Sequence, residues 1–192
     1  MRWLRVDTGR GQCRFEELPA DKVLLGNRGL IAALAREEID PVCHPLGPAN
    51  KLIIAIGPLA GTPVSSSARI SVGGKSPLTG GIKEANGGGE VGRALASLGI
   101  RAVILEDLPP AAVSSPAAAT VGEKTGRDHW RVLVLSEEGA HLEEAEALAG
   151  KGTYETAALL RGWYGEKAAV LCIGPAGEMR LPIAGVFATD PD

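Results

Sequence analysis

The sequence predicts an α+β fold built from a duplicated unit, with two related β-sheets and short flanking helices. Short apolar runs bounded by turn residues indicate buried strands, and apolar residues at helical spacing indicate helices between them. The duplication is indicated by an internal echo, because residues 52–61 read LIIAIGPLAG and residues 169–177 read AVLCIGPAG. Chance is the alternative, since strands ending in Gly-Pro are common. A true repeat predicts two sheets related by a pseudo-twofold axis.

The first predicted half contains a hairpin, two helices and three further strands. Asp7-Thr8-Gly9 turns the hairpin, and Pro19 opens a helical turn. Asn27 is the predicted N-cap of the first helix, Asp40-Pro41 ends it, and Gly99 ends the second helix. The predicted bounds are 2–6 and 13–18 for the hairpin, 30–39 and 91–98 for the helices, and 52–56, 69–72 and 102–105 for the strands.

The second predicted half has strands and helices in a similar order. The predicted bounds are 130–135, 169–173 and 181–187 for strands, 142–149 for a short helix, and 153–163 for a helix capped by Thr153. The three glutamates at 143, 144 and 146 are interpreted as one solvated helix face. We expect a single domain, 1–192, whose halves, about 1–107 and 121–192, are joined by a Pro/Ala-rich surface excursion at 108–120.

Composition excludes several classes of protein. The net charge of −3, from 20 basic and 23 acidic residues, argues against nucleic acid as a partner. The three cysteines lie far apart, which favours a reducing compartment over a disulfide framework. The N-terminus has no apolar signal segment, and no window approaches the roughly 18 apolar residues of a membrane span. The sequence therefore predicts a cytosolic protein that binds neither membrane nor nucleic acid.

A glycine-rich tract over residues 57–92 predicts a site for a multiply charged anion, most simply a phosphate. Asn86, Gly87 and Gly88 present backbone N–H groups just before the second helix, whose dipole adds positive potential. Arg69 is suited to bidentate contact with a phosphate, and Lys75 to contact as a point charge. The alternative is a series of tight turns with solvated basic side chains.

Three other interpretations of these motifs are weaker. Gly87-x-Gly89-x-x-Gly92 matches a dinucleotide fingerprint, but that fingerprint needs a buried strand before its first glycine, and the preceding residues read as a loop. Cys43-His44 lacks the further ligands that a metal site requires. The serines at 65–67, with His129 or His141, lack the nucleophile elbow of a hydrolase.

The tract also carries a resemblance to a known family. NRGL at 27–30, KSPLTGG at 75–81 and EANGGG at 84–89 are its most specific motifs. Further matches are NKL at 50–52, IGPLAGTP at 56–63, ARISV at 68–72, GE at 165–166 and IGPAGE at 173–178. Together they resemble the N-terminal domain of the tungsten-containing aldehyde:ferredoxin oxidoreductases over nearly the whole chain. Two departures are Asn27, where a glycine is usual, and Glu90, where an aromatic residue is more typical.

The resemblance implies a fold and a cofactor. The fold is a duplicated α+β domain of two pseudo-symmetric mixed sheets. The cofactor is a bis-pyranopterin of the molybdopterin type, which carries tungsten or molybdenum and whose phosphates are bridged by magnesium. By motif, Arg69, Asn86 and Gly88 are implied to contact it, with the Asn86 backbone carbonyl as a magnesium ligand. Gly87, Lys75 and Ser76 are implied only by their place in the matching tract.

The resemblance also implies an activity for the complete enzyme, which oxidises an aldehyde to a carboxylate and passes electrons through an iron–sulfur cluster to ferredoxin. The family's later helical domains, which carry the cluster cysteines, are absent from this sequence. We therefore expect no iron–sulfur cluster in this chain, no activity of the chain alone, and partnership with cluster-bearing domains or a subunit. A homo-oligomer is also expected, because the sheet face that later domains cover would be exposed. The alternative function is a stand-alone pterin carrier or assembly module.

Overall fold

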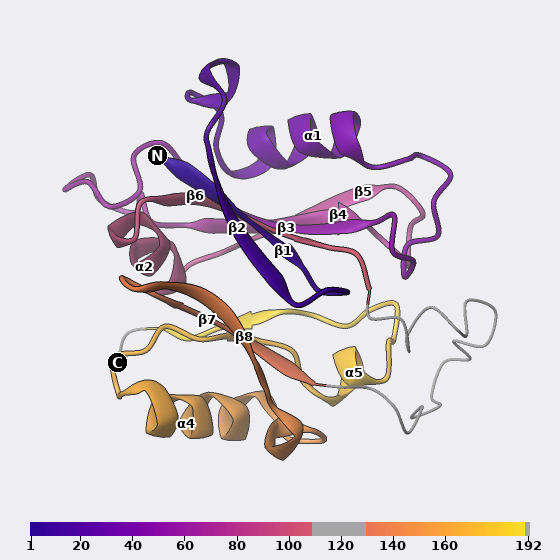
Figure 1. Cartoon of the computed structure of the whole chain (residues 1–192), viewed down its shortest axis with the longest axis vertical. Coiled ribbons are helices and arrows are strands. Elements are labelled where there is room, and N and C mark those ends of the chain that lie inside the picture. The colour runs from indigo at the N-terminus through magenta and orange to yellow at the C-terminus, as the bar shows by residue number, and fades with distance from the viewer. Residues whose placement is uncertain (109–129, 191–192) are drawn as a thin grey trace.

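The computed structural model describes residues 1–108 and 130–190, and it arranges them in four layers (Figure 1). Helix α1 (Asn27–Glu38) covers one face of a large sheet, and the strands of the second half lie against the other face. Helix α4 (Thr153–Tyr164) covers the far side of those strands. The expected α+β class with short flanking helices is confirmed.

The large sheet has six strands in the order β2-β1-β6-β3-β4-β5. Strands β1 and β6 pair in parallel and every other neighbouring pair is antiparallel, so the sheet is mixed. Helix α2 (Val91–Ser97) precedes β6, and the 3-10 turn η1 (Ala20–Lys22) precedes α1. The strands are β1 Arg2–Asp7, β2 Gln12–Glu17, β3 Lys51–Ile56, β4 Ile70–Lys75, β5 Ile82–Gly87 and β6 Ile100–Glu106.

Strand β3 explains why an uninterrupted apolar run folds as a strand. Ile53 and Ala55 are buried in the core under α1, while Ile54 and Ile56 are buried in the core on the opposite face. A strand covered on both faces has no polar alternation to show. The central position of β3 thus fixes the two cores around which the other elements pack.

The second half repeats the element order of the first. Each half has a hairpin, a 3-10 turn, a 12-residue helix and a strand that leads into Ile-Gly-Pro. A Cβ atom placed on Gly57 would lie 2.7 Å from Asn27 Oδ1, and one placed on Gly174 would lie 3.1 Å from Thr153 Cγ2. Both Gly-Pro turns therefore abut the first residue of their half's long helix, so the sequence echo corresponds to a repeated structural unit. The second-half elements are β7 Arg131–Ser136, β8 Gly139–Glu144, η2 Glu146–Leu148, β9 Leu171–Cys172, α5 Pro175–Glu178 and β10 Phe187–Ala188.

Several predicted elements in the second half are wrong. Residues 142–149 are not a helix, because Leu142 pairs with Leu133 in the β7–β8 hairpin and only η2 is helical. Glu143 and Glu144 therefore lie on a strand. In place of the predicted strand at 181–187, the structure has only the two-residue strand β10. Among the described residues, the second-half strands form two separate two-stranded sheets. Short segments like these carry too little periodicity to distinguish helix from strand.

The helix caps and one strand of the first half also differ from prediction. Gly26 and Gly152 are the N-caps of α1 and α4, rather than Asn27 and Thr153. Strand β5 lies where the sequence predicts a loop, and its residues are exposed or half-buried. It is an edge strand, where the burial that makes a strand recognisable is incomplete.

Three remaining expectations concern the chain as a whole. The cysteines at 13, 43 and 172 are free thiols. In the described part of the chain, no helix is long and apolar enough to cross a lipid bilayer. The predicted excursion at 108–120 lies outside the described residues, apart from Leu108.

Candidate functional site

One end of the large sheet gathers most of the predicted site residues. Strand β3 ends there at Ile56, which is paired with Ile70 at the start of β4, and Ile70 is paired with Gly87 at the end of β5. Helices α1 and α2 both begin beside this end. We call it the glycine end, and define it by residues 26–27, 56–58, 68–70 and 86–92.

Some glycines of the glycine end are required by the fold itself. A Cβ on Gly92 would lie 1.9 Å from the Ala68 carbonyl oxygen, and one on Gly26 would lie 2.7 Å from Gly57 Cα. Gly89 has a φ of +96°, and its Cβ would lie 2.4 Å from the Thr189 carbonyl oxygen. These contacts pack the start of α1 against the end of β3, α2 against the segment before β4, and Gly89 against the C-terminal segment. Any side chain would separate the paired segments.

Gly88 is different, because the fold does not explain it. A Cβ on Gly88 would have no atom within 4 Å, and the residue is exposed. The neighbouring Gly87 would make only ordinary contact, 3.6 Å from Ile70 Cγ1. The backbone at Gly88 therefore faces open space, as a segment that a ligand approaches closely would require.

Arg69 supplies a positive charge at the same end. It lies directly before β4, it is exposed, and its guanidinium makes no hydrogen bond or ion pair with any described residue. Its backbone carbonyl accepts a hydrogen bond of 2.9 Å from Asn27 Nδ2. Asn27 has a φ of +47°, a left-handed conformation that glycine adopts freely and asparagine tolerates. This conformation is compatible with the glycine that the family resemblance implies at position 27.

Asn86 is held in place by hydrogen bonds of its side chain to neighbouring strand residues. Asn86 Oδ1 accepts a hydrogen bond from the buried Ser71 hydroxyl, and Asn86 Nδ2 donates to Glu84 Oε2 over 3.3 Å. Glu84 in turn forms an ion pair of 3.1 Å with Arg28 on α1. This chain of contacts fixes the end of β5 against β4 and α1. The supporting roles of Ser71 and Glu84 were not predicted, because the register that joins them appears only once β5 is recognised as a strand.

Lys75 and Ser76 lie at the opposite end of the β4–β5 hairpin. Lys75 lies five residue steps along β4 from Ile70, which corresponds to about 16 Å. Lys75 Nζ donates to the Pro41 carbonyl and, over 2.7 Å, to the Cys43 carbonyl. Ser76 Oγ accepts hydrogen bonds from the Leu78 and Thr79 amides, at 3.2 and 3.3 Å. The structure therefore does not bring these two residues together with Arg69.

Replacing Lys75 with methionine is expected to loosen the loop before β3 rather than to affect a ligand at the glycine end. Methionine keeps the length of the side chain but cannot donate to the Pro41 and Cys43 carbonyls. Amide exchange over residues 41–50 should accelerate about tenfold, which corresponds to the loss of roughly one net hydrogen bond. Unchanged exchange there, with weaker binding of phosphate-bearing ligand, would instead support the predicted anion contact.

The dinucleotide interpretation fails on strand direction, and the loop predicted before Gly87 is wrong. A strand, β5, does precede the first glycine, but it is an exposed edge strand. Each step from β5 through β4 and β3 to β6 is antiparallel, so β5 and β6 run in opposite directions. A dinucleotide fingerprint requires parallel strands on either side of the helix. The α2 region therefore is not a βαβ unit.

The metal and hydrolase interpretations also find no support in the described residues. Among them, no three or more His, Cys, Asp or Glu side chains are grouped closely enough to hold a metal ion. His44 Nδ1 accepts a hydrogen bond of 3.2 Å from the Leu46 amide, within its own turn. His141 Nε2 lies 2.7 Å from Glu143 Oε1 on the same strand, β8, and His129 is outside the described residues.

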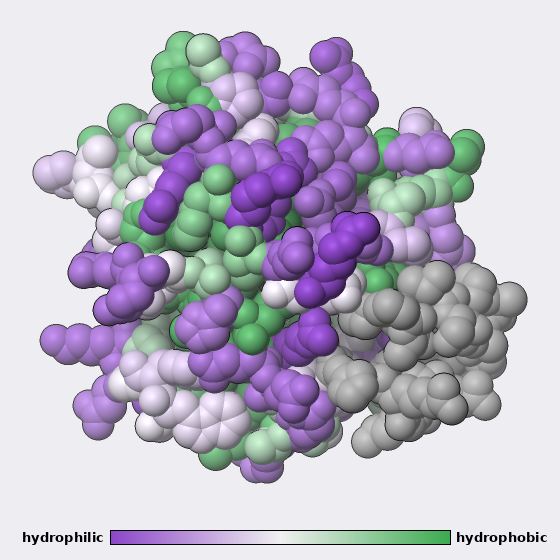
Figure 2. Space-filling view, in the orientation of Figure 1, coloured by the Kyte–Doolittle hydropathy of each residue, from purple (hydrophilic) through white to green (hydrophobic). Residues whose placement is uncertain are grey.

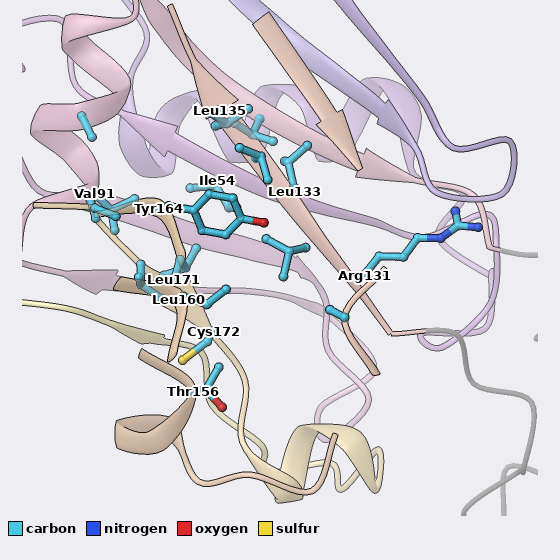
Figure 3. Close-up of a pocket in the computed structure, with 18 of the residues that line it drawn as sticks. Ile54, Val91, Arg131, Leu133, Leu135, Thr156, Leu160, Tyr164, Leu171 and Cys172 are labelled. Atoms are coloured by element: carbon cyan, nitrogen blue, oxygen red, sulfur yellow. The ribbon is translucent and has the colours of Figure 1, made fainter. Parts of the chain in front are cut away.

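A cavity of about 1310 Å³ lies between the large sheet and the second-half layer (Figure 3). The residues labelled in Figure 3 are mainly aliphatic, with Ile54 and Val91 from the first half of the chain and Leu133 and Leu160 from the second. Apolar side chains are visible between the layers on one face of the molecule (Figure 2). Polar and titratable side chains, among them Arg131, Tyr164 and Cys172, also line the cavity.

Comparison with solved structures shows the class of this domain. The active site complex BamBC of benzoyl coenzyme A reductase, in complex with 1,5-dienoyl-CoA, matches with a TM-score of 0.83 and 27% identity. The match covers 98% of this chain and 27% of that one. The chain thus has the fold of a domain that occurs within a larger chain of that reductase complex.

Sequence comparison shows the family. The model for the N-terminal domain of aldehyde ferredoxin oxidoreductase matches residues 3–192, and the chain belongs to this family. The tungsten-containing aldehyde ferredoxin oxidoreductases of Pyrococcus furiosus and Thermococcus kodakarensis are 36% and 35% identical over 190 residues. Each match covers 97% of this chain, and the chain spans only 28% of the length of these relatives.

Proposed function

We propose that the glycine end binds the anionic part of a tungsten-containing pyranopterin cofactor, in an enzyme of the aldehyde:ferredoxin oxidoreductase type. The observation that carries this proposal is that an open backbone at Gly88 and a guanidinium without a partner at Arg69 lie at the same end of the large sheet, among the described residues. The residues present therefore fit a large ligand that bears phosphate.

Each residue has a distinct part in this proposal. Arg69 donates two parallel hydrogen bonds to a phosphate, the geometry for which a guanidinium is suited. Gly88 lets the ligand lie against the backbone, and the side-chain contacts of Asn86 leave its backbone carbonyl for a magnesium ion. When bound, the metal supplies the two-electron oxidation of an aldehyde to a carboxylate. The domain binds, orients and partly shields the cofactor.

The wider proposal concerns the protein that contains this domain. We infer that helical cluster-bearing domains or a subunit complete the cofactor site and pass electrons to ferredoxin in the cytoplasm. Molybdenum is the alternative metal, and a homo-oligomer is the proposed assembly. The isolated chain is expected to lack turnover, since one side of a cradle leaves the ligand solvated. A stand-alone cofactor carrier would bind the same ligand through the same residues, without aldehyde oxidation in any assembly.

Arg69→Ala is expected to lower the tungsten content of the protein, because the phosphate loses its bidentate donor. Hydrogen bonds to charged groups contribute about 1.5–3 kcal/mol, so affinity should fall roughly 10- to 100-fold. The measurement is tungsten per polypeptide by mass spectrometry, after anaerobic expression with tungstate. Arg36→Ala is the matched control, since Arg36 is an exposed arginine at the other end of α1.

Equal tungsten content in wild type and Arg69→Ala would contradict the proposed site. Aldehyde-dependent dye reduction by the chain combined with its cluster-bearing partner separates the enzyme from the carrier. Tight binding of NADH by the chain would instead revive the dinucleotide interpretation.

A further inference from the structure

Two arginines of the large sheet are largely withdrawn from water, and they have opposite surroundings. Arg5 on β1 forms ion pairs with three carboxylates, those of Glu16, Glu38 and Glu106. Arg101 on β6 is only 3% exposed, yet its Nε and Nη1 atoms are buried with no hydrogen-bond partner among the described residues. The sheet therefore supplies acceptors to one buried guanidinium and none to the other.

An unpartnered buried guanidinium is unfavourable, because it gives up hydration and gains no hydrogen bond. Burial lowers the pKa of Arg101, whereas the hydrogen bond that Arg5 donates to Glu38 raises the pKa of Arg5. Buried polar atoms in folded proteins nearly always have a hydrogen-bond partner, so a buried donor without one indicates a missing acceptor. The described part of the chain does not provide one for Arg101.

The position of Arg101 indicates where that acceptor would come from. The pairing of β1 with β6 shifts register at this point, so Arg101 lies in an irregularity at the start of β6. Ala102 is paired with Ala55, which places Arg101 level with Ile56 at the glycine end. Ile56 is paired with Ile70, so two strand spacings, about 10 Å, separate Arg101 from the start of β4.

One edge of the Arg101 guanidinium remains open to a ligand. The Nη2 atom is not among the buried unpaired atoms, and it has no partner among the described residues, so it lies where solvent reaches it. A guanidinium binds phosphate through two adjacent N–H groups, and an anion that enters at Nη2 also reaches Nη1 or Nε. A single phosphate would thereby satisfy Nη2 and one of the two buried atoms.

We propose that Arg101 is a phosphate-binding residue, which holds a phosphate group of a ligand lying across the glycine end. The phosphate belongs either to the metal cofactor of the proposed function or to another phosphorylated ligand. The inference does not depend on the metal, because pyrophosphate alone presents the same oxygens. It assigns a ligand to a residue that the motifs of the tract do not include.

The test is thermal unfolding of the full chain with and without pyrophosphate at about 10 mM, a concentration high enough to saturate a weak phosphate site. Without pyrophosphate, Arg101→Met should melt about 2–4 °C above wild type. The reason is that methionine, which has a side chain of similar length, removes an unpaired buried charge. Pyrophosphate should raise the Tm of wild type and leave Arg101→Met unchanged. Arg93→Met, which alters an exposed arginine of α2, should respond as wild type does.

Other outcomes decide against the proposal or identify the ligand. A lower Tm of Arg101→Met without pyrophosphate, or an equal pyrophosphate response in both proteins, would overturn it. Equal responses to pyrophosphate and to sulfate at matched ionic strength would mean an adventitious ion only. Should the methionine variant not fold, the wild-type Arg101 Nε–H NMR signal must shift with pyrophosphate. Loss of tungsten from Arg101→Met assigns the phosphate to the cofactor, and retained tungsten assigns it to another phosphorylated ligand.

Discussion

Gly92→Ala is expected to destabilise the domain by about 3 kcal/mol, although alanine is the better helix former by about 1 kcal/mol. The new Cβ would lie 1.9 Å from the Ala68 carbonyl oxygen and 2.7 Å from the Ala68 carbonyl carbon. Both are backbone atoms, so a rotamer change cannot relieve the clash, and α2 must move away from the segment before β4. The free energy of unfolding in urea measures this effect.

Gly88→Ala is the matched control for Gly92→Ala. Its Cβ would meet no atom within 4 Å, so the stability should change by less than about 0.5 kcal/mol. The tungsten content should nevertheless fall, because the methyl group would occupy the space assigned to the ligand. Similar losses of stability in both variants would contradict the distinction between structural and ligand-facing glycines.

Arg5→Ala is expected to destabilise the fold by about 2–3 kcal/mol. Arg5 lies 3.0 Å from Glu16, 2.7 Å from Glu38 and 3.1 Å from Glu106. Its loss leaves Glu38 and Glu106 with Lys51 as their remaining cation, and Glu16 with the exposed Arg14. Breaking a fully buried pair costs about 3–5 kcal/mol. The expected value is lower because the Glu38 side chain is 24% exposed and the Glu16 side chain 30%.

Arg14→Ala tests whether burial, rather than pairing, sets the size of that effect. Arg14 also pairs with Glu16, at 2.6 Å, but its side chain is 70% exposed. Exposed pairs contribute about 0–1 kcal/mol, so the loss should be small. Equal losses for Arg5→Ala and Arg14→Ala would contradict the central role given to the buried arginine.

The Arg5 cluster also predicts how stability depends on pH. The hydrogen bond from Arg5 lowers the pKa of Glu38, and hydrogen bonds from Trp3 and Arg5 outweigh burial to lower the pKa of Glu16. A lowered folded-state pKa adds stability above the unfolded glutamate value, about 4.3, and that stability is lost as the pH falls through the folded value. Acid unfolding of Arg5→Ala should therefore show a weaker dependence on pH below about 4.3 than wild type does.

Much of the fold could be predicted, because its strongest patterns are local. The apolar run of β3 and the helical spacing in α1 are visible in a single window, and the Ile-Gly-Pro echo marks the repeat. Strand β5 was missed because an edge strand lacks a buried face. The β8 segment was misread because eight residues with scattered glutamates fit helix and strand alike.

The site was predictable only in part, since sequence proximity is not spatial proximity. Asn86 and Gly88 are adjacent in the sequence and in space, and Arg69 joins them through the β4–β5 register. Lys75 lies closer to Asn86 in the sequence than Arg69 does, yet it lies at the far end of the same hairpin. Arg101 gave no signal, because the absence of a partner around a buried guanidinium is visible only in three dimensions.

The most direct test is the position of tungsten in a crystal of the cofactor-loaded protein, located by anomalous scattering at the tungsten absorption edge. The account predicts a tungsten peak over the glycine end, with the cofactor phosphates beside Arg69 and the backbone at Gly88. A peak beside the 76–81 turn, or against the second half alone, would contradict it.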